Sequence, residues 1–131
     1  MHRHVVLIVE DHPDTCGAIT ALLEGEGYRV ACAVDGEDAL AALRRGLRPC
    51  LILLDMMMPR MSGEEFRDIQ RGSPEWHDIP VALYTGDGQA KEKARRLGLQ
   101  HWFTKPLDVE QLLSVVSDYC QRGTSASPAA S

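Results

Sequence analysis

Short apolar runs alternate along the chain with stretches in which apolar residues recur at helical spacing. The runs lie at residues 5–9, 29–33, 51–54, 80–84 and 102–104. The first, third and fourth are almost continuously apolar, as expected for strands buried on both faces. The pattern therefore predicts five β-strands separated by helix-length segments.

The segments between the runs carry helix start and stop signals. Asp35 is a candidate N-cap for the second helix, Ser62 and Glu65 have capping-box spacing for the third, and Asp108 opens the last. The inner faces are predicted to hold Ile19, Leu22, Leu23, Ala39, Leu40, Leu43, Phe66, Ile69, Ala90, Ala94, Leu97, Leu112, Leu113, Val116 and Tyr119. This βαβαβαβαβα order predicts an α/β fold, a parallel sheet with helices on both faces.

Composition narrows the class of protein. The chain has 131 residues, 44% hydrophobic and 25% charged, which suits one globular domain. A net charge of −5 without a basic cluster argues against direct nucleic-acid binding. The apolar runs are too short for a signal peptide or a membrane span, so the expected localisation is cytoplasmic, without membrane association. We expect one domain over residues 1–122 and a disordered tail over residues 123–131.

The four cysteines are scattered and form no CxxC pair. They are Cys16, Cys32, Cys50 and Cys120. In a reducing cytoplasm, scattered cysteines behave as small buried hydrophobic residues more often than as metal ligands or disulfides. We therefore expect unpaired thiols.

Polar residues gather where the predicted strands end. Glu10 and Asp11 follow the first strand, Asp55 the third, Thr85 the fourth and Lys105 the fifth. Ligands of an open parallel sheet bind beyond these carboxyl ends. Neighbouring carboxylates repel one another, and a hard cation such as Mg²⁺ relieves the repulsion. A central Asp55 with a hydroxyl and an ammonium nearby suits phosphoryl transfer to a carboxylate.

The motifs around these residues resemble a known family. They read VLIVEDHPD, LILLDMMMPRMSG, LYTGDG and HWFTKPLD. Together they resemble the receiver domain of two-component response regulators, from about residue 3 to 121. The resemblance implies the flavodoxin-like, doubly wound (βα)5 fold, with a five-stranded parallel sheet in the order 2-1-3-4-5.

The resemblance also implies roles for individual residues. Glu10 and Asp11 correspond to the acidic pair that binds Mg²⁺, with Mn²⁺ as a substitute, and Asp55 to the phosphoacceptor. The backbone carbonyl of Met57 corresponds to a further metal ligand, and Lys105 to the family's active-site lysine.

Two residues correspond to the conformational switch, and two flank the path of hydrolytic water. Thr85 matches the switch hydroxyl, and Trp102 stands at the switch-aromatic position, where Tyr or Phe is more usual. Met57 and Asp87 lie two positions beyond Asp55 and Thr85, so they are expected to modulate dephosphorylation. His12, after the acidic pair, is expected to be an exposed loop residue rather than a metal ligand.

The implied function is a phosphorylation-dependent signalling module. It catalyses only its own phosphoryl transfer and dephosphorylation, so it is not an enzyme acting on a separate substrate. The expected donor is a histidine kinase or a histidine phosphotransfer protein. The fourth helix, fifth strand and fifth helix are expected to form the face for a target or a homodimer.

Three other functions fit the residues less well. A phosphorylation-independent scaffold would not need the complete acid–Asp–Thr–Lys set. An aspartyl phosphatase would favour an acid two residues after the nucleophile, where the chain has Met57. A flavin carrier would require a Ser/Thr/Gly-rich phosphate loop, whereas the acids at Glu10 and Asp11 would repel phosphate.

Overall fold

A computed structural model describes residues 5–56, 61–86, 89–104 and 108–121. Met57, Asp87 and Lys105, to which the sequence assigns roles, lie outside the described residues, as does the expected tail at 123–131. Within the described part of the chain, no helix is long and apolar enough to cross a membrane.

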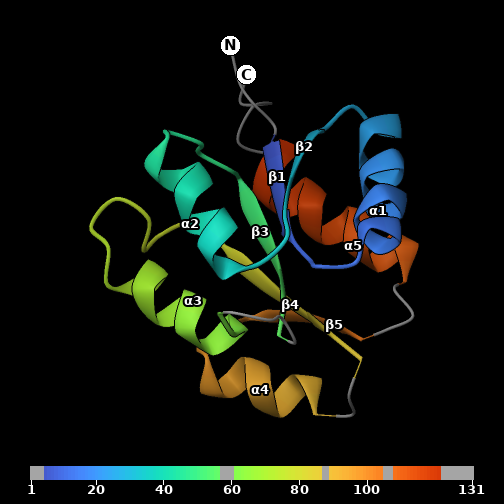
Figure 1. Ribbon diagram of the computed structural model, residues 1–131. Coiled ribbons are helices and arrows are strands. Elements are labelled where there is room, and N and C mark those ends of the chain that lie inside the picture. Colours follow the sequence, from blue (N-terminus) through green and yellow to red (C-terminus); the bar gives the residue numbers. More distant parts are fainter. Residues whose placement is uncertain (1–4, 57–60, 87–88, 105–107, 122–131) are drawn as a thin grey trace.

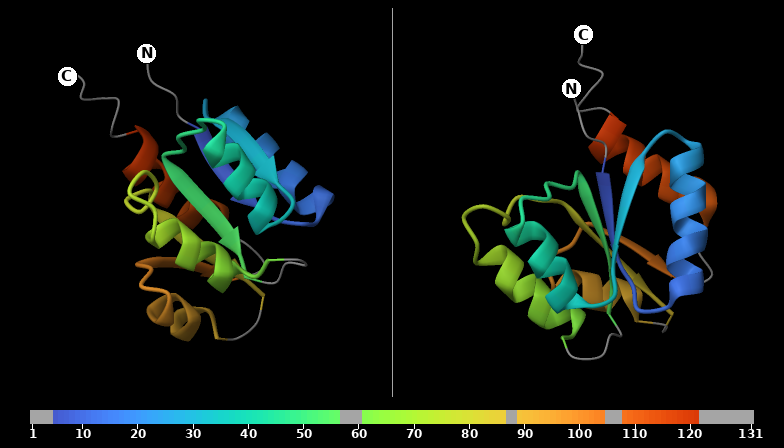
Figure 2. Two further views of the ribbon diagram at one scale, coloured as in Figure 1. Left: turned by 60° about the vertical axis from the view of Figure 1, so that its left-hand side comes forward. Right: turned by 45° about the horizontal axis from the view of Figure 1, so that its top comes forward.

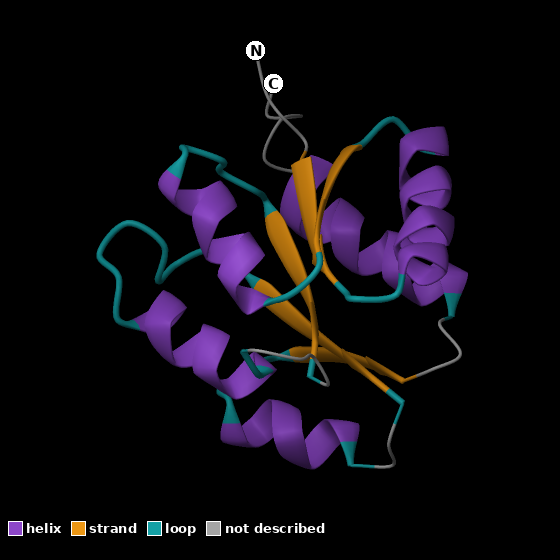
Figure 3. Cartoon of the chain, viewed as in Figure 1, coloured by secondary structure: helices purple, strands orange, loops and turns teal. Residues whose placement is uncertain are grey.

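Five parallel strands form a single sheet, as the alternation of apolar runs predicts (Figures 1 and 3). They are β1 (Val5–Val9), β2 (Arg29–Ala33), β3 (Leu51–Asp55), β4 (Val81–Thr85) and β5 (His101–Thr104). Their order is β2-β1-β3-β4-β5, which confirms the flavodoxin-like topology implied by the family resemblance. β1, β3 and β4 are buried along their whole length, and β2 and β5 form the edges.

The helices cover both faces of the sheet (Figure 2). They are α1 (Pro13–Gly25), α2 (Gly36–Arg44), α3 (Gly63–Arg71), α4 (Ala90–Arg96) and α5 (Val109–Val116), the last continued by the π-helical turn η1 (Ser117–Gln121). α1 and α5 pack on one face, and α2, α3 and α4 on the other, so each face has its own hydrophobic core. Phe66 and Phe103 are the largest fully buried side chains, one in each core.

Local hydrogen bonds begin the helices where the sequence predicts. The Asp35 carboxylate accepts a hydrogen bond from the Asp38 amide at 2.9 Å, and Asp108 caps α5 in the same way. Ser62 and Glu65 form the predicted capping box, with bonds of 3.1 and 2.9 Å. Each contact spans three residues, which is why the sequence alone reveals it.

The predicted inner face of α3 is wrong at one position. Ile69 is 41% exposed, and the neighbouring Gln70 is fully buried instead. The Gln70 side-chain amide donates to the carbonyl oxygens of Trp76 and Ile79, at 2.6 and 3.2 Å. The amide therefore satisfies backbone groups of the connection that follows α3, which a hydrophobic pattern cannot indicate.

The expectation of unpaired thiols is also wrong. Cys16 on α1 is bonded to Cys32 on β2, and Cys50 before β3 to Cys120 in η1. No cysteine remains free. The pairs are 16 and 70 residues apart in sequence, and only the folded topology brings their Cα atoms to 6.6 and 5.2 Å.

Candidate functional site

Three of the candidate residues end or follow central strands and are almost completely buried. Glu10 follows β1, while Asp55 and Thr85 are the last residues of β3 and β4. Their exposed fractions are 2%, 1% and 0%. Because parallel strands end at a common edge, β1, β3 and β4 bring two carboxylates and a hydroxyl to one side of the sheet. Asp and Glu are rarely buried this completely unless a partner offsets their charge, so two buried carboxylates at one edge suit a site that holds a cation.

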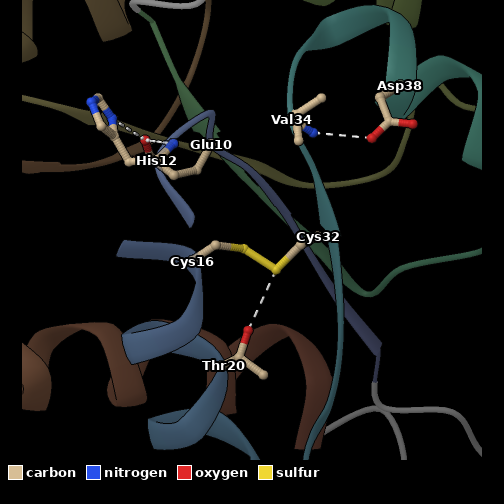
Figure 4. Close-up of a disulfide and its surroundings, with 7 residues drawn as sticks. All are labelled: Glu10, His12, Cys16, Thr20, Cys32, Val34 and Asp38. Atoms are coloured by element: carbon tan, nitrogen blue, oxygen red, sulfur yellow. Dashed lines mark hydrogen bonds and ion pairs between the residues drawn. A yellow bond between two sulfur atoms is a disulfide. The ribbon is translucent and has the colours of Figure 1, made fainter. Parts of the chain in front are cut away.

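The loop after β1 holds the acidic pair together with a histidine. His12 Nδ1 lies 3.0 Å from Glu10 Oε2 and 3.3 Å from Asp11 Oδ1. The His12 backbone amide also donates to Glu10 Oε2, at 3.1 Å (Figure 4). The His12 side chain is 69% exposed, as predicted, but its contact with both acids was not. Their adjacency in sequence is the one signal that could have indicated it.

The donor set of this loop fits a hard divalent cation. One potential ligand atom from each of Glu10, Asp11 and His12 lies within 4.8 Å of the others. Buried Asp11 Oδ1 has the 3.3 Å contact with His12 Nδ1 but accepts no hydrogen bond from the described residues. Carboxylate oxygens are the ligands that Mg²⁺ prefers, and a cation would offset the cost of burying Glu10 and Asp55 near each other.

The charges of the site affect the pKa of a buried tyrosine, Tyr84 of β4. It lies beside Asp55 in the β3–β4 register and is 5% exposed. Burial raises the pKa of the Tyr84 phenol, and the nearby negative charges of Glu10 and then Asp55 raise it further. Because Tyr84 is the register partner of Asp55, its side chain lies at the same edge of the sheet as the candidate site.

Gly63 brings the start of α3 against the end of β3. A Cβ atom at this position would lie 3.1 Å from Met56 Cα and 3.3 Å from the Asp55 carbonyl oxygen. The Gly63 amide donates to the Met56 carbonyl oxygen at 3.4 Å. Any larger residue would press on the backbone that carries Asp55. No local pattern in the sequence marks this glycine, although it lies in the segment LILLDMMMPRMSG.

The switch candidates lie on adjacent strands. Thr85 is fully buried, and Thr104 of β5 is its partner in the parallel register. Trp102 of β5 is half-buried and packs against the core formed with α2, α3 and α4. The structure therefore brings together Glu10, Asp11, Asp55 and Thr85, and it places Trp102 on the strand beside Thr85. Lys105, Met57 and Asp87 are not among the residues that it describes.

Comparison with known proteins agrees with this architecture. The model of the response regulator receiver domain matches residues 6–117. The chain is 34% identical to protein PilH of Pseudomonas aeruginosa over 114 residues, covering 86% of this chain and 93% of that protein. It is 36% identical to the DNA-binding dual master transcriptional regulator RpaA of Synechocystis, covering 89% of this chain but only 49% of RpaA.

Solved structures show the same fold. Chemotaxis protein CheY4 of Vibrio cholerae superposes with a TM-score of 0.80 at 28% identity, covering 90% of this chain and 99% of that one. The receiver domain of sensor histidine kinase PA1611 from Pseudomonas aeruginosa superposes with a TM-score of 0.81 at 25% identity, covering 92% and 99%. That structure has a magnesium ion coordinated in its active-site cleft. With its strand order, its strand-end carboxylates and these matches, the chain belongs to the response regulator receiver domain family.

Proposed function

We propose that Asp55 is the phosphoacceptor of this two-component receiver domain and that Glu10 and Asp11 hold Mg²⁺ beside it. The observation that carries the proposal is the burial of Glu10, Asp55 and Thr85 at one edge of the sheet. Mg²⁺ in the active-site cleft of the PA1611 receiver supports the choice of ion. Mn²⁺ is proposed as a substitute, since it accepts the same carboxylate ligands.

The reaction transfers a phosphoryl group to a carboxylate oxygen. A carboxylate oxygen of Asp55 attacks the phosphorus of a phosphohistidine, the phosphorus–nitrogen bond breaks, and the imidazole leaves with that electron pair. Bound Mg²⁺ would neutralise charge on the carboxylates and on the phosphoryl oxygens. Thr85 donates its hydroxyl proton in a hydrogen bond to a phosphoryl oxygen, and Lys105 pairs with another. We propose no other catalytic activity for the chain than this transfer and its hydrolytic reversal to free Asp55.

Intact-mass measurement with acetyl phosphate tests the proposal. Wild-type protein should gain one phosphoryl group in Mg²⁺ or Mn²⁺ and none in EDTA, and Asp55→Asn should gain none in either. Asp68→Asn is the matched control, because Asp68 is an exposed acid on α3 and should leave labelling unchanged. Labelling of Asp55→Asn to the wild-type extent would refute the assignment.

Trp102 is proposed to report the switch. When the phosphoryl group draws the Thr85 hydroxyl toward it, we expect the half-buried indole on the adjacent strand to turn inward into the space that the hydroxyl leaves. The chain has two tryptophans, so Trp76→Phe leaves Trp102 as the sole emitter. Its fluorescence should change when Mg²⁺ and beryllofluoride are added. Unchanged emission with binding confirmed by calorimetry would contradict the switch role.

The proposed donor is a histidine kinase or a histidine phosphotransfer protein, and the proposed output face is α4, β5 and α5. This face adjoins Thr85 and Trp102, so it is the surface most directly coupled to the site. It would contact a target protein or a second copy of the chain. Amide hydrogen exchange with and without beryllofluoride should differ most over residues 85–119; changes confined to residues 18–43 would contradict this assignment.

Met57 and Asp87 are proposed to set the lifetime of the phosphorylated state. A methionine offers no useful hydrogen bond to orient the attacking water, so hydrolysis should be slow. One positioning contact is worth about tenfold to a hundredfold in rate. Met57→Asn should therefore accelerate loss of the phosphoryl group, and slower or unchanged loss would refute the shielding. Slower loss in Asp87→Ala would make that carboxylate the anchor of the water.

A further inference from the structure

The disulfide between Cys16 and Cys32 lies next to the acidic pair. A hollow of about 330 Å³ has both Cys16 and Cys32 in its wall, together with Glu10 and Asp11. Figure 4 shows the bond crossing from the first turns of α1 to the end of β2. The residues that form the disulfide and the acidic residues proposed to hold the cation therefore line the same hollow.

Both ends of this disulfide are linked to the acidic loop by backbone hydrogen bonds. The Cys16 amide donates to the His12 carbonyl oxygen at 3.0 Å. On the other side, the Glu10 amide donates at 2.9 Å to the carbonyl oxygen of Ala33, the residue after Cys32. The disulfide thus ties together the two elements that flank the loop. Its cleavage would free α1 and β2 to separate, since two unbonded sulfurs need more room than a bonded pair.

The two disulfides of the chain differ in their access to solvent. Cys32 is exposed on the edge strand β2, whereas its partner Cys16 is 5% exposed. In the other pair, Cys50 is half-buried and Cys120 is 3% exposed. An external thiolate must reach a sulfur atom in line to attack a disulfide, so access decides which bond exchanges first. Cys32, the exposed residue of the more accessible pair, is the point of attack that the fold offers.

The hydroxyl group of Thr20 lies beside Cys32. Thr20 Oγ1, one turn after Cys16 on α1, lies 3.4 Å from Cys32 Sγ (Figure 4). After reduction, the Cys32 thiol can donate to this oxygen, so the reduced form keeps a local hydrogen bond while losing the covalent link. One hydrogen bond is much weaker than a covalent link, so the reduced pair holds α1 and β2 together less firmly than the disulfide does.

We propose that Cys16–Cys32 is a thiol–disulfide exchange site whose oxidation state sets the cation affinity of the acidic loop. A thiolate of a dithiol reductant attacks Cys32 Sγ, the bond between Cys32 and Cys16 breaks, and Cys16 leaves as a thiolate that takes up a proton. The second thiol of the reductant then loses its proton and attacks the mixed disulfide, which releases Cys32. Two electrons pass to the protein, and the reductant leaves as its own disulfide.

The coupling to the cation follows from preorganisation. The oxidised pair holds Glu10, Asp11 and His12 between two covalently joined elements, so the loop loses less freedom on binding. After reduction, cation binding must also order the loop. The free-energy cost of that ordering should weaken cation binding about three- to tenfold. The coupling rests on the proposed function, because it assumes that the acidic pair binds the cation.

Graded reduction with dithiothreitol tests the exchange site. The protein is reduced for increasing times, desalted without oxygen, alkylated and mapped by peptide mass spectrometry. Cys16 and Cys32 should be labelled well before Cys50 and Cys120. Equal or reversed order would overturn the assignment of the exchange site.

Titration with Mn²⁺, followed by electron paramagnetic resonance, tests the coupling on portions of the reduced, desalted protein that are taken before alkylation. The Cys50→Ser/Cys120→Ser variant keeps the exchange pair and should lose affinity on reduction, as the wild type does. The Cys16→Ser/Cys32→Ser variant should bind weakly from the start and not respond to reduction. Circular dichroism identifies unfolded samples, and wild-type protein reduced only at the first pair supplies the comparison without any substitution.

The outcomes separate the two proposals. Equal Mn²⁺ affinity in the oxidised and reduced wild-type protein would overturn the coupling and leave the proposed function intact. Absence of Mn²⁺ binding in both states would overturn the cation site, and the coupling with it. A three- to tenfold loss restricted to proteins that carry the Cys16–Cys32 pair would support both.

Discussion

Replacing Gly63 with alanine tests whether the contact between α3 and β3 positions the phosphoacceptor. The new Cβ atom would lie 3.1 Å from Met56 Cα, 3.3 Å from the Asp55 carbonyl oxygen and 2.9 Å from Met56 Sδ. The sulfur ends a flexible side chain and moves easily. One backbone atom belongs to the last residue of the buried strand β3 and the other to the residue that follows it, so the helix and the strand must separate by a few tenths of an ångström.

The stability cost has two opposing parts. Overpacking of this kind costs about 1–3 kcal/mol, and alanine returns at most about 1 kcal/mol of helix propensity at the first turn of α3. We expect a net loss of about 1–2 kcal/mol in the free energy of unfolding. For a domain of this size, that corresponds to a decrease in Tm of about 4–7 °C.

The same displacement should slow phosphorylation of Asp55. A misplacement of about 1 Å costs roughly a hundredfold in rate, so a few tenths of an ångström should cost about three- to tenfold. The assay is the initial rate of labelling by acetyl phosphate in Mg²⁺, at a temperature well below the Tm of the variant. Intact mass measures the labelling, and thermal unfolding followed by circular dichroism measures the Tm.

Gly25→Ala is the matched control. Gly25 lies in the last turn of α1, and a Cβ atom there would meet no other atom within 4 Å. Alanine should stabilise the helix by about 0.5–1 kcal/mol and leave the labelling rate unchanged. If Gly63→Ala melted at or above the wild-type temperature and were labelled at the wild-type rate, the close approach would not position Asp55.

Three further predictions concern stability, and urea unfolding measures each. Ser62→Ala removes the capping box of α3 and should cost about 1 kcal/mol; no change would mean that water replaces the bond. Phe66→Ala should cost about 3–5 kcal/mol, because the ring is fully buried; a loss below 1 kcal/mol would show that the core closes over the gap. Burial, with the charges of Glu10 and Asp55, raises the pKa of Tyr84, so the folded protein keeps the phenol neutral where an unfolded chain ionises it. This stabilisation is complete below about pH 10 and lost as the pH rises further, so the urea midpoint should fall more steeply in the wild type than in Tyr84→Phe; parallel curves would contradict the shift.

The sequence by itself determined the kind and order of the elements. Strands buried on both faces require continuous apolar runs, and helices require apolar residues at helical spacing, so each leaves a local pattern. The caps at Asp35, Ser62 and Asp108 could also be predicted from the sequence, because a cap and its partner are three residues apart. The candidate site followed from the same logic, because parallel strands all end at one edge of the sheet.

Other features were decided only by the tertiary structure, because they join residues that are distant in sequence. The disulfide between Cys50 and Cys120 closes 70 residues, and no local pattern distinguishes a paired cysteine from a buried thiol. Gln70 is buried because carbonyl groups beyond the end of α3 need a donor, which reverses the expectation for Ile69. The position of Cys16 and Cys32 beside the acidic loop depends on how α1 packs on β2. Hydrophobic periodicity indicates which face of a helix or strand is buried. It does not indicate which other residues pack on that face, and these contacts depend on those residues.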